Sequence, residues 1–215
     1  MSRVGMYWRL GAALLMILLP ASRAGAQTLQ GHGFFDVGAT KFTARQSFEA
    51  VLGSATGFVF GGGGGVELPQ QIFIDGRLSR FQKDGHRVFV DNGDVFDLGI
   101  ANTITITPFE ITAGYRFGTR RDSVRPYAGG GISWYRYSET DQFAVAADRV
   151  SQTFTGFHLL GGFEFRVSKW VGIAGEAAWA SVPNGLGQDP GSVGAAFEET
   201  DLGGTTFRAK VVIGR

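Results

Sequence analysis

The sequence predicts an all-β protein, an eight-stranded antiparallel up-and-down transmembrane β-barrel. Eight segments alternate apolar and polar residues with a period of two, which places successive side chains on opposite faces of a strand. The connections between these segments alternate between long and short, as in barrels with long loops at one end and short turns at the other. No apolar run of about 18 residues is present that could cross a bilayer as a helix.

The N-terminus has the pattern of a secretory signal peptide. Arg3 and Arg9 accompany a short apolar run at residues 10–19, and Ala24-Gly25-Ala26 forms an A-x-A cleavage site. The apolar run is too short to span a membrane. We therefore predict that residues 1–26 are removed on export.

The mature chain is predicted to start at Gln27, and residues 27–215 are predicted to form one domain. It would contain 17 basic and 19 acidic residues, because three of the 20 basic residues precede Gln27, and its formal net charge would be −2. No basic cluster suggests binding to nucleic acid. The chain has no cysteine, so an exported protein of this size must gain its stability from a closed, well-packed fold.

The eight strands are each expected where the alternation is clearest, and no helix is expected between them. The predicted strands are residues 30–40, 55–68, 71–81, 103–117, 126–138, 153–166, 171–182 and 203–215. Residues 41–54 and 183–202 are expected to be loops. In the long connection 82–102, the Asn92-Gly93 turn is expected to form a hairpin that extends the third and fourth strands beyond the barrel wall.

The fourth strand changes the parity of its apolar residues. Ile104 and Ile106 are even-numbered, whereas Phe109 and Ile111 are odd-numbered. Proline cannot donate to a strand ladder, so we expect a bulge at Pro108. The facing of the fifth strand is left open.

The hairpin at residues 153–182 separates two chemically different faces. One face is apolar and aromatic: Phe157, Leu159, Phe163, Phe165 and Trp179. The other carries small residues and isolated charges. A soluble barrel would turn the aromatic face inward, but the uneven loop lengths, the scarcity of lysine and the aromatic residues at strand ends favour lipid contact on that face.

Two segments carry a family resemblance. RPYAGGGISWYRY at residues 125–137 and GGTTFRAKVVIG at 203–214, with the signal and strand pattern, resemble small bacterial outer-membrane β-barrels of the OmpA, OmpX and OmpW type. The resemblance is closer to the largely uncharacterised outer-membrane β-barrel domain proteins. Such proteins commonly end in an aromatic residue, whereas this chain ends at Arg215.

The resemblance implies a monomer in the bacterial outer membrane. Its partners would be outer-membrane lipid, lipopolysaccharide and, during biogenesis, the barrel assembly machinery. The sequence names no surface partner.

With the apolar face on lipid, a set of titratable residues is predicted to point into the lumen. These are Asp36, Glu67, Asp75, Arg77, Glu110, Arg116, His158, Glu164, Arg166, Glu176, Arg208 and Lys210. An eight-stranded barrel is only wide enough for side chains to fill it. Paired charges are therefore expected to plug the lumen, and the alternative is a pore that opens when the pairs break.

Three functions fit these observations. The first is a structural or surface-interaction role through long extracellular loops, and the second is an OmpW-like conduit for small hydrophobic molecules. The third is a lipid-modifying enzyme, which would need His158, the only histidine well inside a strand; no serine lies beside it in a recognisable motif. We predict no catalytic residue and no cofactor. Residues 91–97 carry oxygen ligands suited to calcium, but turn chemistry explains them.

Overall fold

A computed structural model describes residues 29–91, 94–119, 121–141, 150–187 and 192–214. The predicted signal peptide lies outside these residues. No helix in the described part of the chain is long and apolar enough to cross a membrane.

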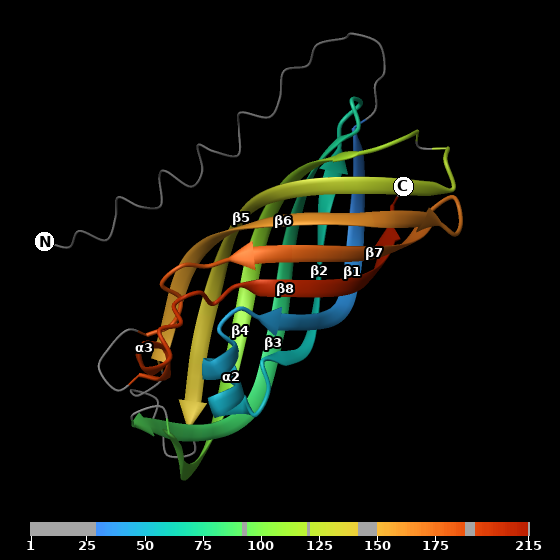
Figure 1. Cartoon of the computed structure of the whole chain (residues 1–215). Helices are drawn as coiled ribbons and strands as arrows, with labels where there is room; N and C mark the ends of the chain where they lie inside the picture. Colours follow the sequence, from blue (N-terminus) through green and yellow to red (C-terminus); the bar gives the residue numbers. More distant parts are fainter. Residues whose placement is uncertain (1–28, 92–93, 120, 142–149, 188–191, 215) are drawn as a thin grey trace, which may run out of the picture.

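Eight antiparallel strands close into a barrel, as the sequence predicted (Figure 1). The strands are β1 (Gln30–Phe42), β2 (Thr56–Glu67), β3 (Ile72–Asp91), β4 (Asp94–Arg116), β5 (Val124–Asp141), β6 (Val150–Arg166), β7 (Val171–Ser181) and β8 (Gly204–Ile213). Each strand pairs with the next, and β8 pairs with β1, which closes the sheet on itself. The start of β1 and the C-terminus lie at one end of the barrel.

Helices α2 and α3 lie at the other end, which we call the mouth (Figure 1). Helix α2 (Arg45–Leu52) follows β1, and the short helix α3 (Val193–Ala196) lies in the β7–β8 loop. The expectation of no helix was wrong here. Phe48 and Leu52 form an apolar stripe at i and i+4 that packs into the mouth, and this tertiary contact stabilises a helix too short to be stable alone.

The β3–β4 hairpin extends beyond the barrel, as predicted. Strands β3 and β4 stay paired as far as Asp91 and Asp94, whereas β5 accompanies β4 only to the pair Asn102 and Asp141. The predicted Asn92-Gly93 turn lies outside the described residues. The connection 82–102 is therefore mostly strand.

The bulge expected at Pro108 is absent. Pairing of β4 with β5 runs without a shift through Pro108 and Tyr135, and the register shift between β3 and β4 falls between Arg87 and Val88. Ile104 and Ile106 point inward and are buried. Even-numbered residues therefore point inward along the whole barrel part of β4. The apparent change of parity arises because the interior is polar in the middle of the barrel and apolar near the mouth.

An apolar core fills the interior near the mouth. Its buried members are Phe42, Ala44, Phe48, Leu52, Ala55, Phe81, Ile104, Ile106, Tyr135, Ala180, Val182 and Leu202. The Phe48 ring stacks on Phe42, with ring centroids 4.0 Å apart, and Phe42 meets Phe81 edge-on. A second, smaller cluster around Phe73, Tyr127 and Leu160 lies toward the other end.

The outer face of the wall is apolar. Phe157, Leu159, Phe163, Phe165 and Trp179 are exposed on it, in the orientation that the sequence predicted. Similar residues line the other strands: Phe35, Phe58, Phe60, Ile74, Leu78, Phe109, Ile111, Ile132, Phe207 and Val211. In β5 the odd-numbered residues point inward, so Tyr127 and Tyr135 are buried and do not belong to the outer aromatic belts.

Inward glycines make room for the largest lumen rings. A Cβ on Gly162 would lie 2.7 Å from the Tyr127 ring, and one on Gly129 would lie 3.1 Å from Phe73. Gly114 contacts Phe73 in the same way. These glycines therefore let aromatic side chains lie flat across the backbone of neighbouring strands.

Candidate functional site

The structure buries eleven of the twelve residues predicted to point into the lumen. They are Asp36, Glu67, Asp75, Arg77, Glu110, Arg116, His158, Glu164, Glu176, Arg208 and Lys210. Arg166 is the exception, because it lies at the end of β6 and its guanidinium donates to the carbonyl oxygen of Asp122 in the β4–β5 turn. It does not join the buried charges.

Six of the buried charges form a central cluster contributed by five strands. Its members are Asp36, Arg77, Glu110, Glu176, Arg208 and Lys210, three acids and three bases. Glu176 lies at its centre: its Oε1 is 2.8 Å from Arg77 Nη1 and its Oε2 is 2.9 Å from Lys210 Nζ. Arg77 also reaches Asp36 and Glu110, each at 3.3 Å. Each buried charge thus has an opposite charge within contact, which is the condition for keeping it out of water.

A basal cluster lies toward the end of the barrel that carries the termini. It consists of Glu67, Asp75, Glu164, Arg116, Arg125 and His32, from six strands. Arg125 donates two hydrogen bonds to Glu67, at 2.9 and 3.1 Å, and Arg116 forms an ion pair with Glu164. His32 Nε2 lies 3.0 Å from Asp75 Oδ1. Together the two clusters use side chains from every strand of the barrel.

Arg125 was not predicted to point into the lumen, because the fifth strand was expected to begin only at residue 126. It is 1% exposed and belongs to β5, which starts at Val124. Arg125 is odd-numbered, like the inward-pointing Tyr127 and Ser133. This parity could have placed Arg125 in the lumen only if the inward face of β5 had been known from the sequence.

Aromatic rings pack against the cations. Lys210 Nζ lies 4.6 Å from the centroid of Phe34 and 5.2 Å from that of Tyr127, and Arg116 lies 5.0 Å from that of Phe73. Tyr127 also donates a hydrogen bond of 3.1 Å to Glu176. The charges are therefore held by rings as well as by counter-ions.

His158 lies between two hydroxyl groups. Its Nδ1 is 2.7 Å from Ser133 Oγ, and its Nε2 is 2.8 Å from Thr112 Oγ1. A serine does lie beside this histidine, although the sequence showed no motif for it. Ser133 is 0% exposed and His158 1% exposed, so the pair is fully buried, and His158 is a hydrogen-bonded core residue.

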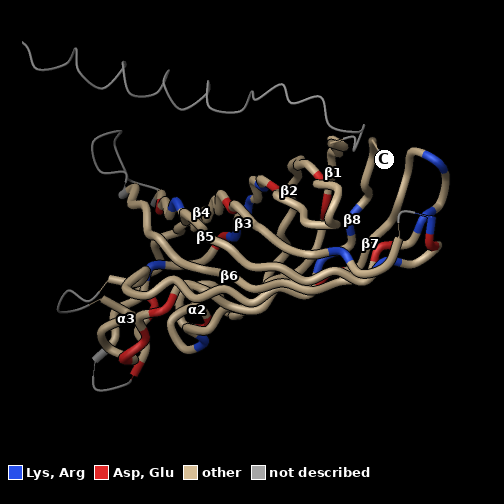
Figure 2. Tube along the Cα trace, turned by 90° about the horizontal axis from the view of Figure 1, so that it is seen from above, with Lys and Arg blue, Asp and Glu red and all other residues tan. Residues whose placement is uncertain are grey.

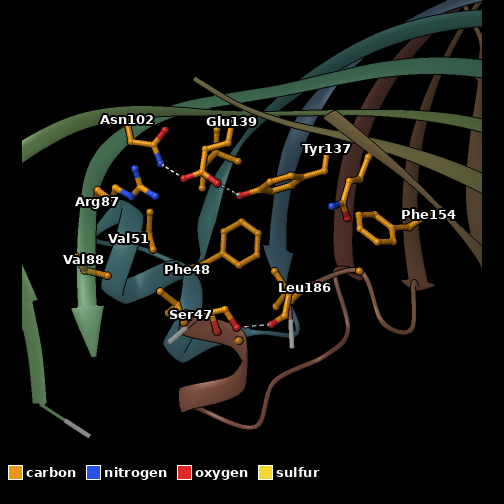
Figure 3. A pocket seen from close by; sticks show the side chains of 17 residues that line it. Ser47, Phe48, Val51, Arg87, Val88, Asn102, Tyr137, Glu139, Phe154 and Leu186 are labelled. Carbon is orange, nitrogen blue, oxygen red and sulfur yellow. Dashed lines mark hydrogen bonds between the residues drawn. The ribbon is translucent and has the colours of Figure 1, made fainter. Parts of the chain in front are cut away.

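A cavity of about 310 Å³ lies at the mouth, beneath α2 and residues 185–187 and 192–194 of the β7–β8 loop (Figure 3). The parts of β3 to β6 that lie nearest the mouth form its other walls. Asn102, Glu139 and Tyr137 form a hydrogen-bonded chain on the barrel side, and the Phe48 ring points into the space from α2. The predicted lumen residues are absent from its described lining.

Glu199 connects α2 to the β7–β8 loop, the two elements that cover this cavity. Its carboxylate accepts hydrogen bonds from the backbone N–H groups of Gln46, at 3.1 Å, and Ser47, at 2.8 Å. These are first-turn groups of α2 that lack intrahelical partners, and the N-cap residue Ala44 has no side chain that could bond them. Glu199, about 150 positions away in the sequence, thus caps α2. Its negative charge also stabilises the positive end of the helix dipole.

Comparison with known proteins decides the family. The family model described as the outer membrane protein beta-barrel domain matches residues 11–211. The chain belongs to this family. No curated protein matches the sequence.

Solved structures share the fold at low sequence identity. Neisserial surface protein A superposes with a TM-score of 0.61 and 17% identity, over 87% of this chain and 99% of that one. A major outer membrane protein from Thermus thermophilus gives a TM-score of 0.53 and 12% identity, over 85% of this chain and 98% of that one. These likenesses concern the fold alone.

The protein is a bacterial outer-membrane β-barrel, and its apolar outer face meets membrane lipid. An even number of strands puts the start of β1 and the end of β8 at the same end of the barrel, together with the short turns. The mouth, α2, α3 and the free end of the β3–β4 hairpin lie at the opposite end. Acidic residues lie along the α3 loop and basic residues in the short turns at the opposite end (Figure 2).

The calcium site considered at residues 91–97 lies partly outside the described residues, because Asn92 and Gly93 are not among them. Among the described residues, no group of three or more histidine, aspartate or glutamate side chains could hold a metal ion. Asp97 instead accepts a hydrogen bond from its neighbour Gly99 at 2.7 Å and contacts His86. The bond from Gly99 to Asp97 closes a local turn.

Proposed function

We propose that this barrel has a closed lumen and acts as a structural and surface-interaction protein of the outer membrane. The observation that carries the proposal is the pair of charge clusters. Their side chains meet across the lumen from all eight strands.

The packing of the interior supports a closed lumen at two levels. In the central cluster, Arg77 and Arg208 reach acids on other strands and occupy the middle of the barrel. Toward the mouth, the buried core around Phe42, Phe81 and Ile106 is built from apolar side chains. A hydrated ion would have to displace both layers, and breaking a buried pair leaves a charge uncompensated at a cost of about 3–5 kcal/mol.

The surface role is supported by what lies beyond the wall. The β3–β4 hairpin carries Phe89, Val95, Phe96 and Leu98, all about half exposed, at its free end. Apolar side chains that are solvated in this way are typical of surfaces that meet a partner.

A planar-bilayer conductance measurement tests the proposal. Wild-type protein should give no reproducible current steps. The triple variant Arg77→Ala/Arg208→Ala/Phe81→Ala removes two guanidinium groups from the central cluster and one ring from the apolar core, so it weakens both layers and should conduct. The matched control Arg45→Ala/Arg80→Ala changes two exposed arginines and should remain silent.

The same experiment separates the alternatives. Steady conductance by the wild type would refute the closed lumen and favour the gated pore. Uptake of a small hydrophobic molecule into vesicles that contain the wild-type barrel would favour the OmpW-like conduit. Nothing in the geometry of His158 supports a lipid-modifying enzyme, because its environment is closed.

A further inference from the structure

We infer that the mouth cavity is a binding site for small, neutral amphipathic molecules with a planar apolar body and hydrogen-bond donors at one end. The inference does not depend on the closed lumen, since the cavity lies on the outer side of the apolar core. It follows from the size, the walls and the polar groups of the cavity.

The cavity has the dimensions of a small-molecule site. Its volume of about 310 Å³ lies at the lower end of the ~300–1,000 Å³ typical of such sites, and barrel mouths are a common location for them. A site of this size can accommodate a molecule as small as a substituted bicyclic ring.

The apolar walls are suited to a flat ring. Phe48 enters from α2 and Phe154 from β6, with Leu186 at the side (Figure 3). The Phe48 ring is held in place because its other face stacks on Phe42 at an interplanar angle of 4°. A rigid aromatic wall costs little conformational entropy on binding.

Polar groups line the cavity from the barrel side and from α2, and they include acceptors. Glu139 is oriented by Asn102 Nδ2 and by the Tyr137 hydroxyl, which donates at 3.4 Å, and a carboxylate has further acceptor sites beyond these two. Ser47, only 5% exposed, also lines the cavity, and its hydroxyl has no hydrogen-bond partner among the described residues. A buried hydroxyl without a partner is costly, and a ligand group could satisfy it.

The charge of the lining argues for a neutral ligand. Glu139 and Arg87 face the same cavity with opposite signs, and they are the charged residues of the lining within the part of the chain that the structure describes. The opposite charges offset each other, so the lining as a whole attracts an ion of neither sign. A neutral hydroxyl or ring N–H donor can still use the acceptors.

The test uses indole-3-ethanol, which has a planar body and two donors. Methyl NMR spectra of the full barrel in micelles would be recorded during titration. We expect saturable shifts at Val51, Ile104 and Leu186 in the cavity. The lipid-facing methyl groups of Leu159 and Val211 report partitioning into the micelle and should not saturate.

Two variants test the assignment. Val51→Trp fills the cavity and should abolish the saturable shifts at Ile104 and Leu186, whereas the control Val95→Trp adds the same side chain at the exposed hairpin and should leave them unchanged. Glu139→Ala removes a charged acceptor and should weaken binding about ten- to a hundredfold.

The proposal is overturned if the cavity methyl groups do not shift, or shift only in parallel with the lipid-facing ones. It is also overturned if 2-ethylnaphthalene, which has no donor, binds as tightly as indole-3-ethanol. A heat-dependent gel shift on each variant establishes that it is folded, so that loss of binding is not loss of structure.

Discussion

Individual residues in the lumen are selected by space as much as by charge. Tyr127 bonds Glu176 and packs on Lys210, and it can do so because Gly162 opposite has no Cβ. Gly161, the next residue, points outward, and a Cβ there would come no closer than 3.6 Å to the Tyr127 carbonyl oxygen. Two adjacent glycines thus have different physical roles.

The substitution Gly162→Ala should therefore destabilise the barrel by about 1–3 kcal/mol, the usual cost of overpacking. Gly161→Ala is the control, because both changes reduce the entropy of the unfolded chain equally and only the contact differs. Urea unfolding in micelles, followed by gel mobility, measures the difference. Equal midpoints would show that the lumen has room for a methyl group at Gly162, where a Cβ would meet the Gly175 carbonyl oxygen as well as the Tyr127 ring.

Among the elements, α2 is the one that depends most on a distant residue. Its N-cap residue, Ala44, has no side chain that can accept a hydrogen bond, and its first turn has no acidic residue. Glu199 instead accepts hydrogen bonds from two of its N–H groups. Helix α2 and the β7–β8 loop consequently form one cap over the mouth cavity. The apolar stripe of Phe48 and Leu52 fixes the position of that cap.

The variant Glu199→Gln keeps the size of the side chain but leaves one oxygen to accept two N–H groups. Losing a cap interaction costs about 1 kcal/mol, so amide exchange at Gln46 and Ser47 should become about fivefold faster while the barrel stays as stable as before. Glu198→Gln changes the neighbouring acid and should leave exchange in α2 unaltered. If both variants behave alike, Glu199 is not the cap.

For the molecule as a whole, the arrangement is apolar outside and charged inside, the reverse of a soluble protein. Lipid surrounds the outer face, while buried ion pairs, aromatic rings and an apolar mouth core fill the interior. Closure of the sheet satisfies every strand edge, which a membrane requires of any β-structure.

This orientation predicts different effects of one substitution at two leucines. Leu159 is 58% exposed on the wall and Leu98 is 51% exposed on the hairpin beyond it. Leu159→Arg should cost ~2–4 kcal/mol if it lies near the bilayer midplane, because arginine would then face hydrocarbon, whereas Leu98→Arg should cost almost nothing. Folding into lipid vesicles, scored by the gel mobility of unboiled protein, measures both. Equal tolerance would mean that the wall does not face lipid there.

The sequence by itself determined the eight strands, their antiparallel order and the outward face of most of them. This was possible because the direction of a side chain in a strand alternates locally and short turns leave few alternative pairings. It also located eleven of the twelve predicted lumen residues inside the barrel. Their role as a plug remains a proposal.

Only the tertiary structure decided which residues meet. Arg125 and Glu67 are 58 positions apart, and Glu199 and Ser47 are 152 positions apart, so no local pattern could pair them. Ile104 and Ile106 looked outward because apolar residues were expected only on the lipid side. They point inward because α2 covers the mouth and removes water from it. The same alternation of side chains therefore encloses an apolar interior at the mouth and a polar interior farther along the barrel.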